Sequence, residues 1–189
     1  MDAYSSFIYK SRYSRWLGNR REQWDETVDR YLDFFKLDGT LRSELFDAIH
    51  SLEVMPSMRA MWTAGPALSR CNVAAYNCSY LPINHIRCFD ELMYVLMCGT
   101  GVGFSTERQY INELPTVSEH FEKSGTIIRV GDSKSGWARA YRELISLLYS
   151  GQMPGWNTDD VRPAGSPLKT FGGRASGPEP LEDLFEFTT

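Results

Sequence analysis

Apolar residues recur at helical spacing along much of the chain, and each such run predicts a helix. The runs lie at about 24–35, 41–52, 88–97, 135–149 and 180–189. Thr40 suits the N-cap of the second helix, and Gly99 suits the residue that follows the third. The last run begins like an amphipathic helix and ends without a cap, so its apolar face predicts packing against residues beyond this chain.

Other segments interrupt the helical pattern. Residues 73–81 form an apolar-rich run that predicts a mostly buried strand. Gly99, Gly101 and Gly103 alternate, which suits either close approach of the backbone to a ligand or a tight turn from helix to strand. Residues 151–180 are rich in Gly and Pro, which is typical of loops. The pattern as a whole predicts an α/β fold.

Composition narrows the class of protein. Of the 189 residues, 42% are hydrophobic, which is enough for a sizeable core. The formal charge of −4 argues against a dedicated nucleic-acid-binding protein, which would usually be basic. No apolar run approaches the ~20 residues that a membrane-spanning helix needs, and no apolar signal core follows the first residues. We therefore expect a cytoplasmic protein with neither membrane nor nucleic-acid partners.

The four cysteines do not form a recognisable metal site or disulfide framework. Cys71, Cys78, Cys88 and Cys98 contain no Cys-x-x-Cys pair, and the three histidines are scattered. We predict no metal ligands, and small buried hydrophobes at Cys88 and Cys98. Cys78 is the exception, because it lies within the motif Tyr76-Asn-Cys-Ser-Tyr80.

The segment 7–21 interleaves basic and aromatic residues. Such a stretch could bind nucleic acid through phosphate contacts and stacking. We favour a solvated basic face, because the chain as a whole is acidic.

Two loops have features that suit binding of a phosphorylated ligand. The segment 160–169 carries the cations Arg162 and Lys169, which could hold a triphosphate or remain solvated. The segment 172–178 consists mostly of small residues that permit close backbone contact. These patterns alone indicate an α/β nucleotide-binding fragment.

Five motifs in a fixed order extend this interpretation. They are Met55-Pro-Ser-Met-Arg59, Tyr76-Asn-Cys-Ser-Tyr80, Gly99-Thr-Gly-Val-Gly-Phe104, Val161-Arg-Pro-x-Gly165 and Gly172-Gly-x-Ala-Ser-Gly-Pro178. In this order they resemble the catalytic chains of ribonucleotide reductases. The early segments 13–17 and 24–28 make the chain most similar to the monomeric, adenosylcobalamin-dependent (class II) ribonucleoside-triphosphate reductases.

The resemblance implies a fold and a domain organisation. Reductases of this family have a ten-stranded α/β barrel made of two half-barrels. This chain would hold an N-terminal helical region at 1–53 and the incomplete first part of the barrel at 54–189. Residues 107–159 would correspond to an insertion that imitates the partner subunit and permits a monomeric enzyme; the alternative is a surface helical hairpin.

The resemblance also implies site residues. Cys78 aligns with the cysteine that reduces the substrate and forms a redox-active disulfide with a second cysteine in the other half-barrel. Ser57, Asn77 and Gly101, together with Cys78, match segments that line the substrate. Arg162 and Lys169 match basic positions that bind the allosteric effector, a deoxynucleoside triphosphate.

The activity implied is reduction of ribonucleoside triphosphates to 2′-deoxyribonucleotides by thiyl-radical chemistry. It would require the missing C-terminal portion of the reductase, a thioredoxin-like reductant and adenosylcobalamin, whose contacts lie mostly outside this chain. The fragment alone is expected to be inactive. Two alternatives remain open: a catalytic-chain piece of a metal-subunit (class I) reductase, and a non-catalytic deoxynucleotide-binding or interaction fragment.

Overall fold

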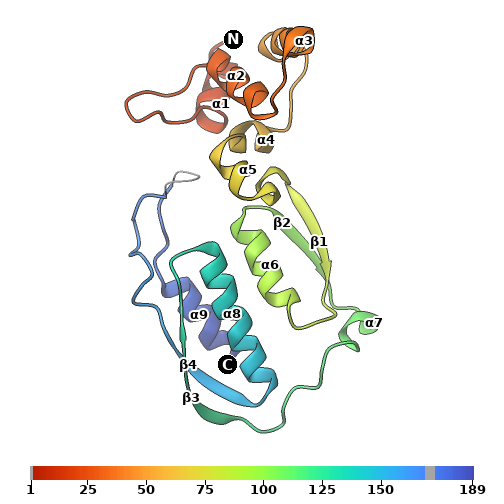
Figure 1. Cartoon of the computed structure of the whole chain (residues 1–189), viewed down its shortest axis with the longest axis vertical. Coiled ribbons are helices and arrows are strands. Elements are labelled where there is room, and N and C mark those ends of the chain that lie inside the picture. The colour runs from red at the N-terminus through yellow and green to blue at the C-terminus, as the bar shows by residue number, and fades with distance from the viewer. Residues whose placement is uncertain (1, 169–172) are drawn as a thin grey trace. The chain divides into compact units, whose positions relative to one another are not determined.

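The computed structural model describes residues 2–168 and 173–189 and divides the chain into two compact units (Figure 1). The first unit extends to Asn77, and the second runs from Cys78 to Thr189. The start of the barrel at residue 54 stays a prediction, because it rests on the architecture of the family. The compact unit ends later because Met61 packs with the preceding helices.

The N-terminal unit is helical. Its elements are α1 (Ala3–Arg12), α2 (Trp24–Phe34), α3 (Gly39–His50), α4 (Met58–Thr63), α5 (Pro66–Arg70) and the 3₁₀ helix η1 (Asn72–Ala75). Val28 and Leu32 on α2, Ile49 on α3 and Met61 on α4 form its buried core. The helix predicted at 24–35 is confirmed. The next helix starts earlier than predicted, because Asp38, and not Thr40, has the extended backbone of the N-cap.

The C-terminal unit contains two β-α-β segments. The first joins β1 (Cys78–Pro82), α6 (Cys88–Met97) and β2 (Gly101–Ser105). The short helix α7 (Arg108–Ile111) precedes the second segment, which joins β3 (Glu122–Arg129), α8 (Lys134–Tyr149) and β4 (Gln152–Asn157). Helix α9 (Glu179–Thr188) ends the unit. Strands β1 and β2 are parallel, as are β3 and β4. The mixed helix and strand content confirms the predicted α/β class.

Helices α8 and α9 share the larger core of this unit. Leu144 of α8 and Leu181 and Phe185 of α9 are almost completely buried, together with Ile128 of β3. The expectation that the apolar face of the last helix needs residues beyond this chain is therefore wrong for Leu181 and Phe185. The segment 107–159 is also not a surface helical hairpin, because it holds two parallel strands and part of this core.

The strand predicted at 73–81 is wrong in extent and burial. Its first half forms η1, which buries Ala74, and β1 begins only at Cys78. Residues 78–80 are exposed. Gly99 has φ +82° and follows the end of α6, as predicted, and the glycines after it belong to β2. Within the described residues, no helix has the length and apolarity to cross a membrane.

Candidate functional site

The structure brings Cys78 and Gly101 together on neighbouring strands. Cys78 is the first residue of β1, and its partner across the parallel ladder is Gly101, the first residue of β2. Ser79 reinforces the pairing, since its Oγ donates a hydrogen bond to the carbonyl oxygen of Gly101 at 3.2 Å. Cys78 is a free and exposed thiol, and exposed Asn77 directly precedes it.

The positions of β2 opposite Cys78 and Tyr80 are both glycines. Side chains alternate between the faces of a strand, so Cys78 and Tyr80 lie on the same face of β1. Their partners on β2 are Gly101 and Gly103, neither of which has a side chain. A Cβ added at Gly103 would lie 3.9 Å from Cδ2 of Tyr80, which is an ordinary contact. The glycines therefore leave backbone atoms open to a ligand next to the thiol.

Ser57 has a structural role in the N-terminal unit. It is the N-cap of α4, where its Oγ accepts a hydrogen bond from the amide of Ala60 at 3.4 Å. Asn77 is the last residue of the same unit, whereas Cys78 and Gly101 belong to the other. A contact of Ser57 with substrate therefore stays a prediction.

Arg162 forms an ion pair that the sequence analysis missed. Its Nε lies 2.9 Å from each carboxylate oxygen of Asp132, and the hydrogen bond from Arg162 lowers the pKa of Asp132. Asp132 precedes Ser133, the N-cap of α8, whose Oγ accepts from the amide of Gly136 at 2.9 Å. The available signal was an Asp-Ser pair directly before an amphipathic helix.

The Arg162–Asp132 pair lies just beyond the carboxyl ends of β3 and β4, beside the start of α8. That edge of a parallel sheet is where α/β proteins commonly bind ligands, and a helix N-terminus favours anions there. In the loop that follows, Arg174 donates to the carbonyl oxygen of Gly165 at 2.8 Å. Lys169, the second predicted effector residue, lies outside the described residues.

Comparison with known proteins relates the chain to one group of enzymes. No protein-family profile matches it. It is 29% identical over 255 aligned positions to the adenosylcobalamin-dependent ribonucleoside-triphosphate reductase of Lactobacillus helveticus, and 28% identical to that of Lactobacillus acidophilus. Each match covers 94% of this chain and 34% of the relative. The chain is homologous to adenosylcobalamin-dependent ribonucleotide reductases.

The fold of this chain also matches that of a solved reductase. A crystal structure of a B12-dependent (class II) ribonucleotide reductase superimposes with a TM-score of 0.82, covering 96% of this chain and 36% of that one, at 23% identity. The chain thus spans about a third of the length of the reductases it matches. The 255 aligned positions also exceed its 189 residues, so the relatives contain internal residues with no counterpart here.

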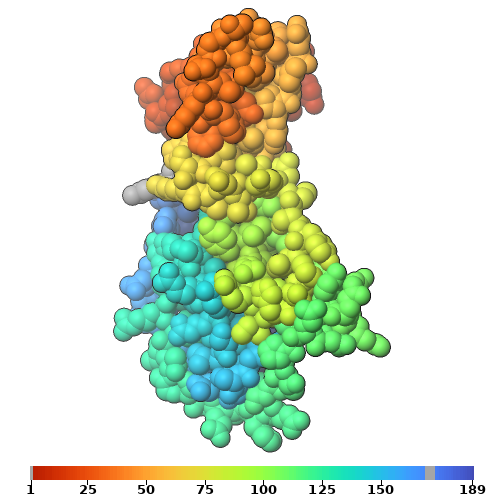
Figure 2. Space-filling view, turned by 45° about the vertical axis from the view of Figure 1, so that its right-hand side comes forward, coloured from red at the N-terminus to blue at the C-terminus, as the bar shows by residue number. Residues whose placement is uncertain are grey.

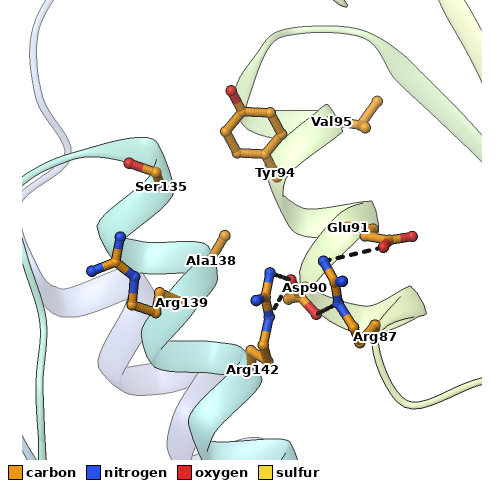
Figure 3. A pocket seen from close by; sticks show the side chains of 9 residues that line it. All are labelled: Arg87, Asp90, Glu91, Tyr94, Val95, Ser135, Ala138, Arg139 and Arg142. Atoms are coloured by element: carbon orange, nitrogen blue, oxygen red, sulfur yellow. Dashed lines mark hydrogen bonds and ion pairs between the residues drawn. The ribbon is translucent and has the colours of Figure 1, made fainter.

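The described part of this reductase homologue contains a pocket of about 560 Å³ between α6 and α8 (Figure 3). In its wall, buried Asp90 accepts two hydrogen bonds through Oδ2, from Nε of Arg142 at 2.9 Å and from Nη2 at 2.6 Å. Charged side chains dominate the lining of this pocket, so it does not fit the largely apolar face of a corrin ring. Residues 2–168 and 173–189 contain no group of His, Cys, Asp and Glu side chains that could hold a metal ion.

Proposed function

We propose that this chain is the part of a class II ribonucleotide reductase that supplies one thiol of the reducing pair. The observation that carries the proposal is the exposed Cys78 at the start of β1, directly opposite Gly101 of β2, in a chain homologous to these reductases over 94% of its length. The substrate would be a ribonucleoside triphosphate, as the names of the relatives state for those proteins.

The proposed chemistry balances with two thiols. The substrate loses its 2′-hydroxyl as water and gains a hydrogen at C2′. Cys78 and a second cysteine, which lies outside the described chain, together lose two electrons and two protons and join in a disulfide. A thioredoxin-like dithiol then reduces that disulfide. Adenosylcobalamin, when bound in the complete enzyme, would supply the radical that starts the reaction.

The residues around Cys78 would position the ribose. The Gly101 backbone lies beside the thiol with no side chain to exclude a sugar, and Asn77 places an amide next to it in the sequence. We propose that Asn77 and Gly101 contact the sugar and that Ser57 contacts a phosphate. Ser57 would have to combine this contact with its hydrogen bond to Ala60.

The loop containing Arg162 would bind a deoxynucleoside triphosphate as the allosteric effector. Asp132 holds the Arg162 guanidinium through Nε, which leaves its terminal nitrogens for an anion. The nearby start of α8 adds a favourable electrostatic environment for phosphate. Lys169 would add a second cation.

Replacing Arg162 with alanine should weaken effector binding. A charge-assisted hydrogen bond to phosphate contributes about 1.5–3 kcal/mol, so we expect the effector dissociation constant to rise roughly tenfold or more, with the basal rate unchanged. Equilibrium binding of a labelled deoxynucleotide to the reconstituted enzyme measures this. Arg108→Ala, at an exposed arginine of α7, is the matched control and should bind normally. Unchanged affinity in Arg162→Ala would refute the effector assignment.

The isolated 189-residue chain should reduce no ribonucleotide. In the described C-terminal unit, Cys78 lacks a facing thiol, because Cys88 and Cys98 are buried in and directly after α6. Tyr80 and Phe104 on the β1–β2 pair are 62% and 60% exposed, so we also expect the chain to aggregate. Incubation with a ribonucleoside triphosphate, adenosylcobalamin and dithiothreitol should yield no deoxynucleotide. Adding a chain that carries the rest of the reductase should restore activity, and turnover by the isolated chain would contradict this prediction.

A further inference from the structure

Two glycine backbones meet closely where the chain turns from β3 into α8. A Cβ added at Gly136 would overlap the carbonyl oxygen of Gly131 and lie 2.8 Å from its carbonyl carbon, so alanine at 136 would force the backbone to move. The reverse substitution is different, because a Cβ added at Gly131 would lie 3.7 Å from Cα of Gly136, which is an ordinary contact. The contact therefore requires glycine at only one of its two positions, residue 136.

This close approach fixes both neighbours of Asp132. On one side, Gly131 touches Gly136, and its carbonyl oxygen accepts a hydrogen bond from the amide of Ser133 at 2.8 Å. On the other side, Oγ of Ser133 accepts from the amide of Gly136 at 2.9 Å. Asp132 thus belongs to a turn that is closed onto the first turn of α8. The turn is exposed, and Figure 2 shows turquoise residues of this region on the surface of the molecule.

The backbone before Arg162 is also fixed in place. Arg162 follows Val161, which is buried in the core of the unit and whose amide donates to the carbonyl oxygen of Thr158 at 2.8 Å. With this segment held, Nε of Arg162 lies 2.9 Å from both carboxylate oxygens of Asp132. A hydrogen bond is lost when its heavy atoms are more than about 3.5 Å apart. A small displacement of the turn that carries Asp132 would therefore break the pair.

We propose that Gly136 is a positioning residue for anion binding by Arg162. Because Gly136 has no side chain, the turn can close onto α8, and Asp132 then orients the Arg162 guanidinium through Nε. Helix propensity does not explain glycine at this position, because alanine is the more favourable residue within a helix. The proposal rests on the effector role proposed above for Arg162, and it adds a residue that contacts no ligand itself.

Equilibrium binding of a labelled deoxynucleoside triphosphate to the reconstituted enzyme tests the proposal. In Gly136→Ala the dissociation constant should rise about fivefold or more, because the displaced Asp132 no longer orients Arg162. Gly131→Ala is the matched control from the other side of the same contact and should bind within about twofold of the native enzyme. Gly136→Ala combined with Arg162→Ala should bind no more weakly than Arg162→Ala alone, because Gly136 acts through Arg162.

A crystal structure of the Gly136→Ala enzyme separates the positioning role from the effector assignment. Nε of Arg162 should lie beyond hydrogen-bond distance of Asp132 in this variant, while Gly131→Ala should keep the pair. An unchanged pair in Gly136→Ala, a variant that no longer folds, or additive losses of affinity in the double variant would each overturn the proposal. A separated pair in an enzyme whose Gly136→Ala and Arg162→Ala variants both bind the effector normally would support the positioning role and refute the effector assignment.

Discussion

Replacing Cys78 with serine should abolish multiple turnover in the enzyme reconstituted with the rest of the reductase. Each deoxynucleotide formed requires two electrons, and a serine hydroxyl cannot close a disulfide. Nucleotide binding should stay nearly intact, because the side chain changes little in volume and Cys78 is exposed at the start of β1. Product formation in the presence of a dithiol reductant is the measurement, with equilibrium binding of the nucleotide alongside.

The other cysteines are the controls for this experiment. Cys88 and Cys98 are buried, and the Cys88 thiol donates to the carbonyl oxygen of Pro82 at 3.2 Å. Their alanine variants should lose about 1 kcal/mol of stability each while turnover continues, and Cys71→Ser should behave likewise. After one turnover without external reductant, Cys78 should resist alkylation because it is joined to a cysteine of the remaining portion. Normal turnover by Cys78→Ser would show that the assignment is wrong.

Replacing Glu22 with alanine should destabilise the N-terminal unit by about 3–5 kcal/mol, because it removes a buried carboxylate and leaves a partly buried cation without its counter-charge. Glu22 is 4% exposed and accepts hydrogen bonds from Nε of Arg30 at 2.7 Å and from Oγ1 of Thr27 at 2.8 Å. Arg30 in turn donates to the carbonyl oxygens of Met61 at 2.8 Å and Ala64 at 2.9 Å. The cluster therefore ties α2 to the end of α4.

A second partly buried arginine, Arg15, lies in the electrostatic field of the same carboxylate. Arg15 donates to the carbonyl oxygen of Trp62 and, at 2.8 Å, to that of Ala64. Burial and the neighbouring charge of Arg30 lower the pKa of Arg15 to about 10, so it is still charged at neutral pH. Without Glu22, the guanidinium groups of Arg15 and Arg30, which both donate to the carbonyl oxygen of Ala64, would lose the carboxylate that offsets their mutual repulsion.

Urea denaturation, monitored by tryptophan fluorescence, would measure the loss of stability in Glu22→Ala. Glu44→Ala is the matched control, since it removes an exposed acidic residue of α3 that forms no ion pair among the described residues, and the midpoint should change little. A Glu22→Ala variant as stable as this control would show that the cluster does not stabilise the unit.

The ionisation of Glu22 should make the stability of the N-terminal unit depend on pH. Burial alone would raise the pKa of Glu22, but the hydrogen bonds from Arg30 and Thr27 outweigh it and lower the pKa below 4.5. The ionised carboxylate therefore stabilises the fold above pH 4.5, and this contribution is lost as the pH falls from 4.5 through the folded pKa. Urea midpoints measured at pH 7 and at pH 3 should differ more for the native chain than for Glu22→Ala.

Local periodicity in the sequence was sufficient to predict most of the helices. The apolar spacings at 24–35, 88–97 and 135–149 correspond to α2, α6 and α8, because a helix places residues three and four apart on one face whatever lies elsewhere in the chain. The ordered motifs likewise indicate the relationship to the reductases, because a motif is legible in the sequence alone. The short strands were harder, because an apolar run such as 73–81 is equally compatible with a buried turn such as η1.

Only the tertiary structure decided which distant residues meet. Gly101 lies opposite Cys78 because β1 and β2, which α6 connects, pair in parallel. Asp132 holds Arg162, and Glu22 holds Arg30, through contacts whose geometry depends on the packing of whole elements. No spacing rule along the chain encodes such pairs, because the energy of each contact is realised only when the burial of apolar faces has brought its two segments together.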